Sequence, residues 1–240
     1  MNDVDELRAA IGQQDVCAVR RLVDDSPRLV EAIDRNGLTA LMFAVLHEQR
    51  SVEVVSAIID AGARINTQRS DGYTALHCSI DVTGPARLNA ENVITKLVSA
   101  GADLEVRQKY GWTPLICAVV RNRPVEVRCL LAVGAQPNAT LPRDSVPAFS
   151  AGRTALMAAL TAPACAEILP AMLQAGADPF QRDEDGLDFF SYANMLRSDW
   201  GEWRFSGVVD RGEAIVRAWL KHNRHPSIDA RNQTVSWLQF

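Results

Sequence analysis

The chain has 240 residues, 48% of them hydrophobic and 22% charged, so it can bury a sizeable core, and disorder is excluded as its main state. Its formal net charge of −4 argues against a surface that holds a polyanion throughout, and no nucleic-acid partner is expected. Three acids stand among the first six residues, where a signal peptide would need basic ones, and no run of about 18 apolar residues occurs. We therefore expect a cytoplasmic protein without a membrane partner.

The cysteines are odd in number, widely spread and never arranged as Cys-x-x-Cys. This pattern predicts neither a disulfide framework nor a zinc site, and reduced thiols inside the fold are expected instead. The residues are Cys17, Cys78, Cys117, Cys129 and Cys165.

Two short signatures recur along the chain in alternation. The first is GLTAL at 37–41, GYTAL at 72–76, GWTPL at 111–115, GRTAL at 152–156 and a worn copy, GLDFF, at 186–190. The second is AGARIN at 61–66, AGADLE at 100–105, VGAQPN at 133–138 and AGADPF at 175–180. Two signatures that keep the same order and frame indicate a structural repeat.

The predicted elements follow from this frame, unit by unit. In each unit a large residue such as Leu115 precedes a small one such as Ala118 by three positions, which makes one stripe of a first helix. A second helix ends in two apolar residues, and a glycine such as Gly134 follows as the left-handed stop. The units are an N-terminal capping unit at 1–34, repeats at 35–66, 67–105, 106–138 and 139–183, a C-terminal capping unit at 184–223 and a tail at 224–240.

The signatures resemble the ankyrin repeat, whose pattern is Gly-x-Thr-Pro/Ala-Leu-His, two helices and then Gly-Ala-Asp-x-Asn. The resemblance implies an all-α solenoid of helix-turn-helix units with protruding β-turn or hairpin fingers. The chain departs from a plain array through insertions around 83–87, in 139–149 and around 198–205. The two end units break the pattern, as expected of caps that face solvent on one side.

No catalytic or metal-binding motif stands out, so we expect neither enzyme activity nor a cofactor. His77 lies where ankyrin repeats place a histidine that hydrogen-bonds the finger backbone, and the resemblance assigns it that structural role. His222 and His225 lack a nearby third ligand, so no metal site is predicted.

The resemblance places the partner-binding surface on the concave side, which the fingers and first helices line. Its predicted contacts are Arg35, His47, Tyr73, Asp81, Lys109, Tyr110, Trp112, Arg121 and Arg153. Tyr, Trp and Arg dominate interface hot spots, but Trp112 could instead pack on a neighbouring finger. Residues 105–153 carry seven bases against three acids, which predicts a partner with an acidic or mixed surface over the central repeats.

A possible secondary site lies in the insertion of the last unit, with Trp200, Trp203 and Phe205. These aromatic residues either cover the end of the array or anchor a partner, and Trp237, Leu238 and Phe240 in the tail pose the same choice.

Three classes of function stay open from the sequence. The leading one is a stand-alone protein-binding module, monomeric when free, that acts as a cytosolic inhibitor or as a toxin-neutralising immunity protein, as bacterial relatives of this kind do. The second is an effector or regulator of host or cellular proteins. The third is an accessory protein with a small-molecule pocket around Trp200.

Overall fold

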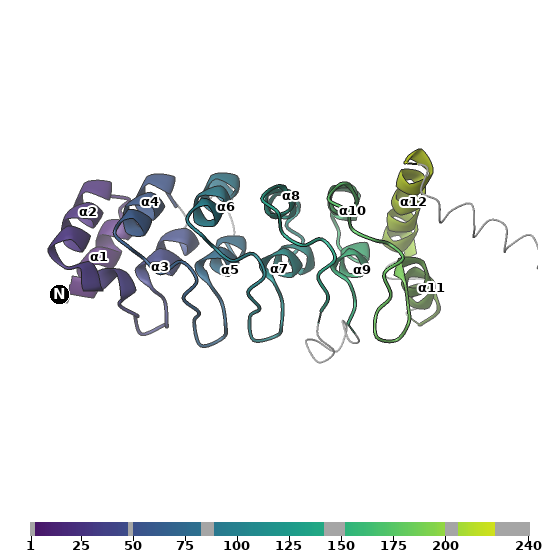
Figure 1. Cartoon of the computed structure of the whole chain (residues 1–240), viewed down its shortest axis with the longest axis horizontal. Coiled ribbons are helices and arrows are strands. Elements are labelled where there is room, and N and C mark those ends of the chain that lie inside the picture. The colour runs from purple at the N-terminus through teal and green to yellow at the C-terminus, as the bar shows by residue number, and fades with distance from the viewer. Residues whose placement is uncertain (1–2, 48–49, 83–88, 142–151, 200–205, 224–240) are drawn as a thin grey trace, which may run out of the picture.

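The computed structural model describes residues 3–47, 50–82, 89–141, 152–199 and 206–223. Within these ranges the chain forms twelve α-helices and one 3-10 helix, and its only strand-like pairing is an isolated bridge between Thr140 and Thr154. Figure 1 shows the helices in two rows, with the fingers looping out beside the row of first helices. The predicted all-α solenoid is confirmed.

The first helices are α1 (Asp3–Gly12), α3 (Ala40–Leu46), α5 (Ala75–Ile80), α7 (Pro114–Val120), α9 (Ala155–Leu160) and α11 (Phe189–Asp199). The second helices are α2 (Val16–Asp25), α4 (Val52–Asp60), α6 (Ala90–Ser99), α8 (Pro124–Ala132), α10 (Cys165–Gln174) and α12 (Ser206–His222), with the 3-10 helix η1 (Pro27–Glu31) after α2. Each of the six predicted units contains one pair of helices, while the unit boundaries themselves stay a prediction.

The threonine of the first signature begins each central first helix as its N-cap. The Thr39 hydroxyl accepts the Met42 N–H at 3.3 Å, and the Thr113 hydroxyl accepts the Ile116 N–H at 3.3 Å. In α7 a proline, Pro114, follows the cap directly, where its missing N–H costs nothing. The signature therefore fixes where the first helices start.

The glycine of the second signature ends each central second helix. Gly62, Gly101, Gly134 and Gly176 all have φ between 90° and 101°. This left-handed conformation strains a residue with a Cβ, so glycine is the residue expected there.

A row of side-chain acceptors links successive units just after this glycine. The Asn66 Oδ1 accepts the Asp103 N–H at 2.9 Å, and the Asn138 Oδ1 accepts the Asp178 N–H at 2.8 Å. In the last signature Phe180 takes the place of the asparagine and packs on Phe190, with ring centroids 5.8 Å apart. The linkage therefore stops where the C-terminal cap begins.

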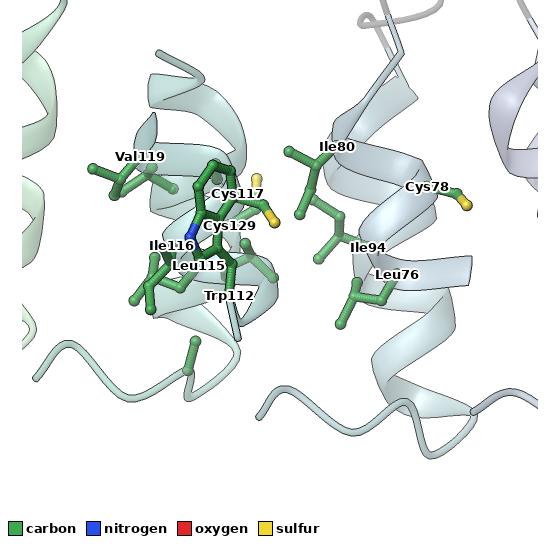
Figure 2. Packing of buried hydrophobic residues seen from close by; sticks show 14 of the residues in the cluster. Leu76, Cys78, Ile80, Ile94, Trp112, Leu115, Ile116, Cys117, Val119 and Cys129 are labelled. Carbon is green, nitrogen blue, oxygen red and sulfur yellow. The ribbon is translucent and has the colours of Figure 1, made fainter. Parts of the chain in front are cut away.

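The core is one continuous cluster that runs between the units. Figure 2 shows part of it, where Leu76, Ile80 and Ile94 of one unit face Leu115 and Cys117 of the next. Four of the cysteines are buried as predicted, but Cys17 is exposed on α2. The small residues of the first helices are buried too, and they let neighbouring helices approach closely.

This packing predicts the effect of enlarging a small residue between helices. Ala118 is fully buried, so Ala118→Leu should overfill the contact and cost roughly 1–3 kcal/mol of unfolding free energy, measured by urea denaturation. Ala159→Leu should behave alike, since Ala159 is equally buried. The matched control is Ala166→Leu on the exposed face of α10, and equal stability of all three variants would contradict the helix frame.

Candidate functional site

The fingers share one backbone form, which lines up their tips along the array. In the finger 69–73 the Arg69 N–H donates to the Tyr73 carbonyl oxygen at 2.9 Å, and in the finger 108–112 the Gln108 N–H donates to the Trp112 carbonyl oxygen at 3.0 Å. The fingers 34–38 and 183–187 close in the same way, at 3.0 and 2.9 Å. Residues at the same place in each finger therefore face the same way.

The structure divides the predicted contact residues into open and buried ones. Arg35, Lys109 and Tyr110 are exposed at finger tips, and Tyr110 keeps 53% of its surface. Arg121 is exposed at the end of α7, while Asp81 and His47 are half-buried at the ends of α5 and α3. The open residues lie on the finger tips and at the ends of first helices.

Three of the predicted contacts are buried, which corrects the expectation of an open surface at these positions. Tyr73, Trp112 and Arg153 keep only 8%, 9% and 8% of their surface. Each follows its finger glycine directly, and this position turns the side chain onto a first helix instead of into solvent. Figure 2 shows the Trp112 indole lying against the buried core of the array with Leu115 and Cys117, so the packing alternative holds for Trp112.

Tyr73 joins the finger 69–73 to the ends of α5 and α7 in one polar network. Its hydroxyl accepts the Arg121 Nη2–H at 2.8 Å, and Arg121 Nη1 lies 2.7 Å from Asp81 Oδ1. The Arg69 guanidinium lies 5.3 Å from the centre of the Tyr73 ring and binds Asp71 through both Nε and Nη2. The network holds Arg121 at the surface in a fixed position.

The charges of this network follow from burial and pairing. Burial raises the pKa of Asp81, and the Arg121 guanidinium acts against that rise. Arg69 holds the pKa of Asp71 below its usual range through their hydrogen bonds. Burial raises the pKa of Tyr73. The carboxylates of Asp71 and Asp81 are therefore each paired with an arginine of the same chain.

Tyr110 is an exposed aromatic side chain on a finger whose buried residues, Gln108 and Trp112, contact it. Its N–H donates to the buried Gln108 side chain, and its ring lies 6.0 Å from the Trp112 ring. The neighbouring Lys109 N–H donates to the Asp71 carbonyl oxygen at 2.8 Å, which ties this finger to the preceding one. A rigid exposed tyrosine of this kind is typical of interface anchors.

His77 supports the same finger from the core, as the resemblance implied. Its Nδ1 accepts the Thr74 N–H at 3.4 Å, so the proton lies on Nε2, which donates to the Trp112 carbonyl oxygen at 3.1 Å. Burial lowers the pKa of His77 from its ordinary 6.5, and the neutral ring is the form that the fold holds.

This histidine predicts a pH dependence of stability. Because the folded pKa lies below 6.5, its contribution is fully present above pH 6.5 and is lost as the pH falls toward the folded pKa. His77→Gln can keep both hydrogen bonds and should remove that part of the slope, as read from urea unfolding between about pH 5 and 7. The same slope in both proteins would show that the ring does not titrate in this way.

Two arginines each bind a finger aspartate and an aromatic ring where a capping unit meets its neighbouring repeat. The sequence analysis did not predict these contacts. Arg8 binds the buried Asp34 and lies 4.1 Å from the centre of the Phe43 ring. At the other end Arg153 lies 3.9 Å from Asp183 and 4.3 Å from the centre of the Tyr192 ring, with its Nη1–H donating to the Tyr192 hydroxyl at 3.1 Å.

The signal for these contacts is present in the sequence. An aromatic residue follows the finger aspartate by nine positions at both junctions, Phe43 after Asp34 and Tyr192 after Asp183. The central fingers 69–73 and 108–112 have Arg69 and Gln108 at the position of this aspartate, so they lack the aspartate–aromatic pair.

The basic residues of the central repeats do not form one patch. Arg107 donates to the carbonyl oxygens of Gly111 and Thr140, at 2.7 and 2.9 Å, and Arg128 pairs with Glu167 at 3.2 Å in the row of second helices. Of the described bases in this segment, Arg121, Arg128 and Arg153 have a carboxylate within ion-pair distance, whereas Arg107, Lys109 and Arg123 have none among the described residues. Arg143 lies outside the described residues.

The described residues offer little for catalysis or metal binding. Burial raises the pKa of the Cys78 and Cys117 thiols to about 12, so neither is a thiolate nucleophile at neutral pH. No group of three or more metal-ligating side chains gathers in the described part of the chain, and none of its helices is long and apolar enough to span a bilayer. Trp200, Trp203 and Phe205, His225 and the tail lie outside the described residues.

Comparisons with known proteins agree on one family. A family model described as ankyrin repeats (3 copies) matches residues 7–85 and 85–183, whereas no curated protein matches the chain. The chain is similar to an ankyrin repeat domain from Acinetobacter baumannii, with 25% identity and a TM-score of 0.63 over 79% of this chain and 90% of that one. It is also similar in fold to the ankyrin repeat protein EF0377, with 22% identity and a TM-score of 0.67 over 90% and 98%.

Proposed function

Because the chain belongs to the ankyrin-repeat family, we propose that it is a non-enzymatic module that binds a partner protein along its finger tips and the ends of its first helices. The observation that carries the proposal is Tyr110, an aromatic side chain more than half exposed on a finger that Gln108, Trp112 and His77 hold rigid. A pre-organised aromatic group loses little conformational entropy when a partner covers it.

The proposed contact surface is smaller than the full set of sequence candidates. It keeps Arg35, His47, Asp81, Lys109, Tyr110 and Arg121. Tyr73, Trp112 and Arg153 support it from inside, because a partner cannot cover side chains that the array already covers.

The finer proposal is a cytoplasmic inhibitor or immunity protein that acts as a monomer. Its support is that these contact residues lie on one side of the array, on the finger tips and the first-helix ends. A module with one such side can block the active or docking surface of a partner.

A photo-crosslinking residue placed at position 110 tests the proposal in living cells. We expect one discrete protein adduct from position 110 and none from the control position 125, since Val125 is an exposed apolar residue in the row of second helices. An adduct at position 125 with none at position 110 would place the partner on the opposite side of the array.

With the captured partner in hand, Tyr110→Ala should weaken binding by about 2 kcal/mol or more without changing the melting temperature, because the lost ring is an exposed anchor. Titration calorimetry measures the affinity. The matched control is Val125→Ala, which removes an exposed apolar side chain in the row of second helices and should leave binding unchanged.

A further inference from the structure

The charge on the finger tips changes sign along the array. The finger 34–38 carries Arg35, the finger 108–112 carries Lys109, and the finger 183–187 carries Glu184 and Asp185. All four side chains are exposed. A partner that covers this row therefore meets basic groups on the early and central fingers and acidic groups on the last one.

The central part of the row has positive charge left over after its own pairing. Asp71 is bound through both oxygens by Arg69, and Asp81 is paired with Arg121 at 2.7 Å. The Lys109 backbone lies beside these pairs, because its N–H binds the Asp71 carbonyl oxygen. Its ammonium has no ion-pair partner among the described carboxylates, and Asp71 and Asp81 are paired with arginines. This unpaired lysine directly precedes Tyr110 in the chain, and both residues are exposed.

The Lys109 ammonium and the Tyr110 ring together define which chemistry a complementary partner surface needs. An exposed ammonium attracts a carboxylate, and a half-exposed tyrosine ring gains most from an apolar or aromatic side chain laid against it. A long polyanion fits less well, since it would have to pass Glu184 and Asp185 if it followed the row.

We propose that Lys109 and Tyr110 receive an acidic segment of the partner protein, in which a carboxylate lies next to an aromatic or apolar side chain. The proposal rests on the proposed function and names the chemistry of its ligand. Arg121 and Arg69 stay bound to Tyr73, Asp81 and Asp71, so Lys109 carries the unpaired positive charge of the contact. Binding through an exposed ammonium weakens as the ionic strength rises.

A labelled random copolymer of glutamate and tyrosine serves as the probe, with polyglutamate, a lysine–tyrosine copolymer and a single-stranded oligonucleotide for comparison. Fluorescence anisotropy with the full chain should show that the glutamate–tyrosine copolymer binds most tightly. Lys109→Glu and Tyr110→Ala should each weaken that binding by about tenfold or more. The matched control is Lys221→Glu, the same charge reversal on exposed Lys221 of α12, which should change binding less than twofold by the same reasoning.

Several results would overturn the proposal while leaving the crosslink from position 110 intact. Equal losses in Lys109→Glu and Lys221→Glu would show unspecific attraction by net charge. Tighter binding of the oligonucleotide, lost in Lys109→Glu, would identify a nucleic-acid surface. If no copolymer binds at all, the partner uses other chemistry at Tyr110. A missing crosslink at position 110 would instead count against the proposed function itself.

Discussion

Gly72→Ala should unfold at a much lower urea concentration than the parent, with a loss of roughly 3–5 kcal/mol. Gly72 has φ +81°, and a Cβ there would lie 2.8 Å from Gln108 Cα and 2.9 Å from the Lys109 nitrogen. These neighbours are backbone atoms, so they cannot rotate away. The new methyl group would push the finger 108–112 from the finger 69–73 and break the hydrogen bond from Lys109 to Asp71.

Gly62→Ala is the matched control for this result. Gly62 has a similar φ of +90°, but a Cβ there would meet no atom within 4 Å. It should therefore cost only the left-handed strain, roughly 1–2 kcal/mol. Equal losses in the two variants would mean that the fingers do not pack as closely as described.

Arg153→Met should also destabilise the protein strongly, by about 3–5 kcal/mol, because it leaves a buried carboxylate without its cation. The side chain of Asp183 is fully buried, and its Oδ1 accepts the N–H groups of Asp185 and Leu187 at 3.0 and 2.8 Å. The methionine keeps much of the arginine's apolar length, so the loss reports on the guanidinium, through its pairing with Asp183 and its contacts with Tyr192.

The double variant Arg153→Met with Asp183→Asn separates this pairing from simple loss of packing. A neutral asparagine can still accept both finger N–H groups, so the double variant should recover part of the lost stability in urea unfolding. A loss below about 1 kcal/mol for Arg153→Met alone would show that the guanidinium does not hold this junction.

The repeat frame could be predicted because each helix boundary has a local chemical cause. Thr39 and Thr113 cap helices through their own hydroxyls, and Gly62 and Gly134 stop helices through a conformation that glycine adopts without strain. None of these roles depends on a distant residue, so the sequence alone carries them.

The exposure of the site residues could not be predicted in the same way, because it depends on the neighbouring unit. Tyr73 is buried where it reaches Arg121, 48 positions away, and Arg153 is buried where it reaches Tyr192, 39 positions away. Tyr110 lies two positions from Trp112 and yet remains exposed. The finger position, not the residue type, decides which aromatic side chain can meet a partner.

The local excess of positive charge along residues 105–153 did not predict one basic patch, for a related reason. A count along residues 105–153 adds side chains from both rows of helices and from the fingers. Arg128 pairs in the second row, whereas Arg107 binds backbone carbonyl groups between fingers. Only the three-dimensional arrangement shows that Lys109 and Tyr110, neighbours in the chain, are both exposed.

Amide hydrogen exchange of the free protein and of its complex tests the binding surface most directly. Our account predicts that the partner slows exchange in the finger 108–112 and at the ends of α5 and α7 around Asp81 and Arg121. The outer helices α6 and α8 should exchange as they do in the free protein. Protection confined to α6 and α8, or to the C-terminal cap around α12, would contradict the assignment of the partner to the finger tips.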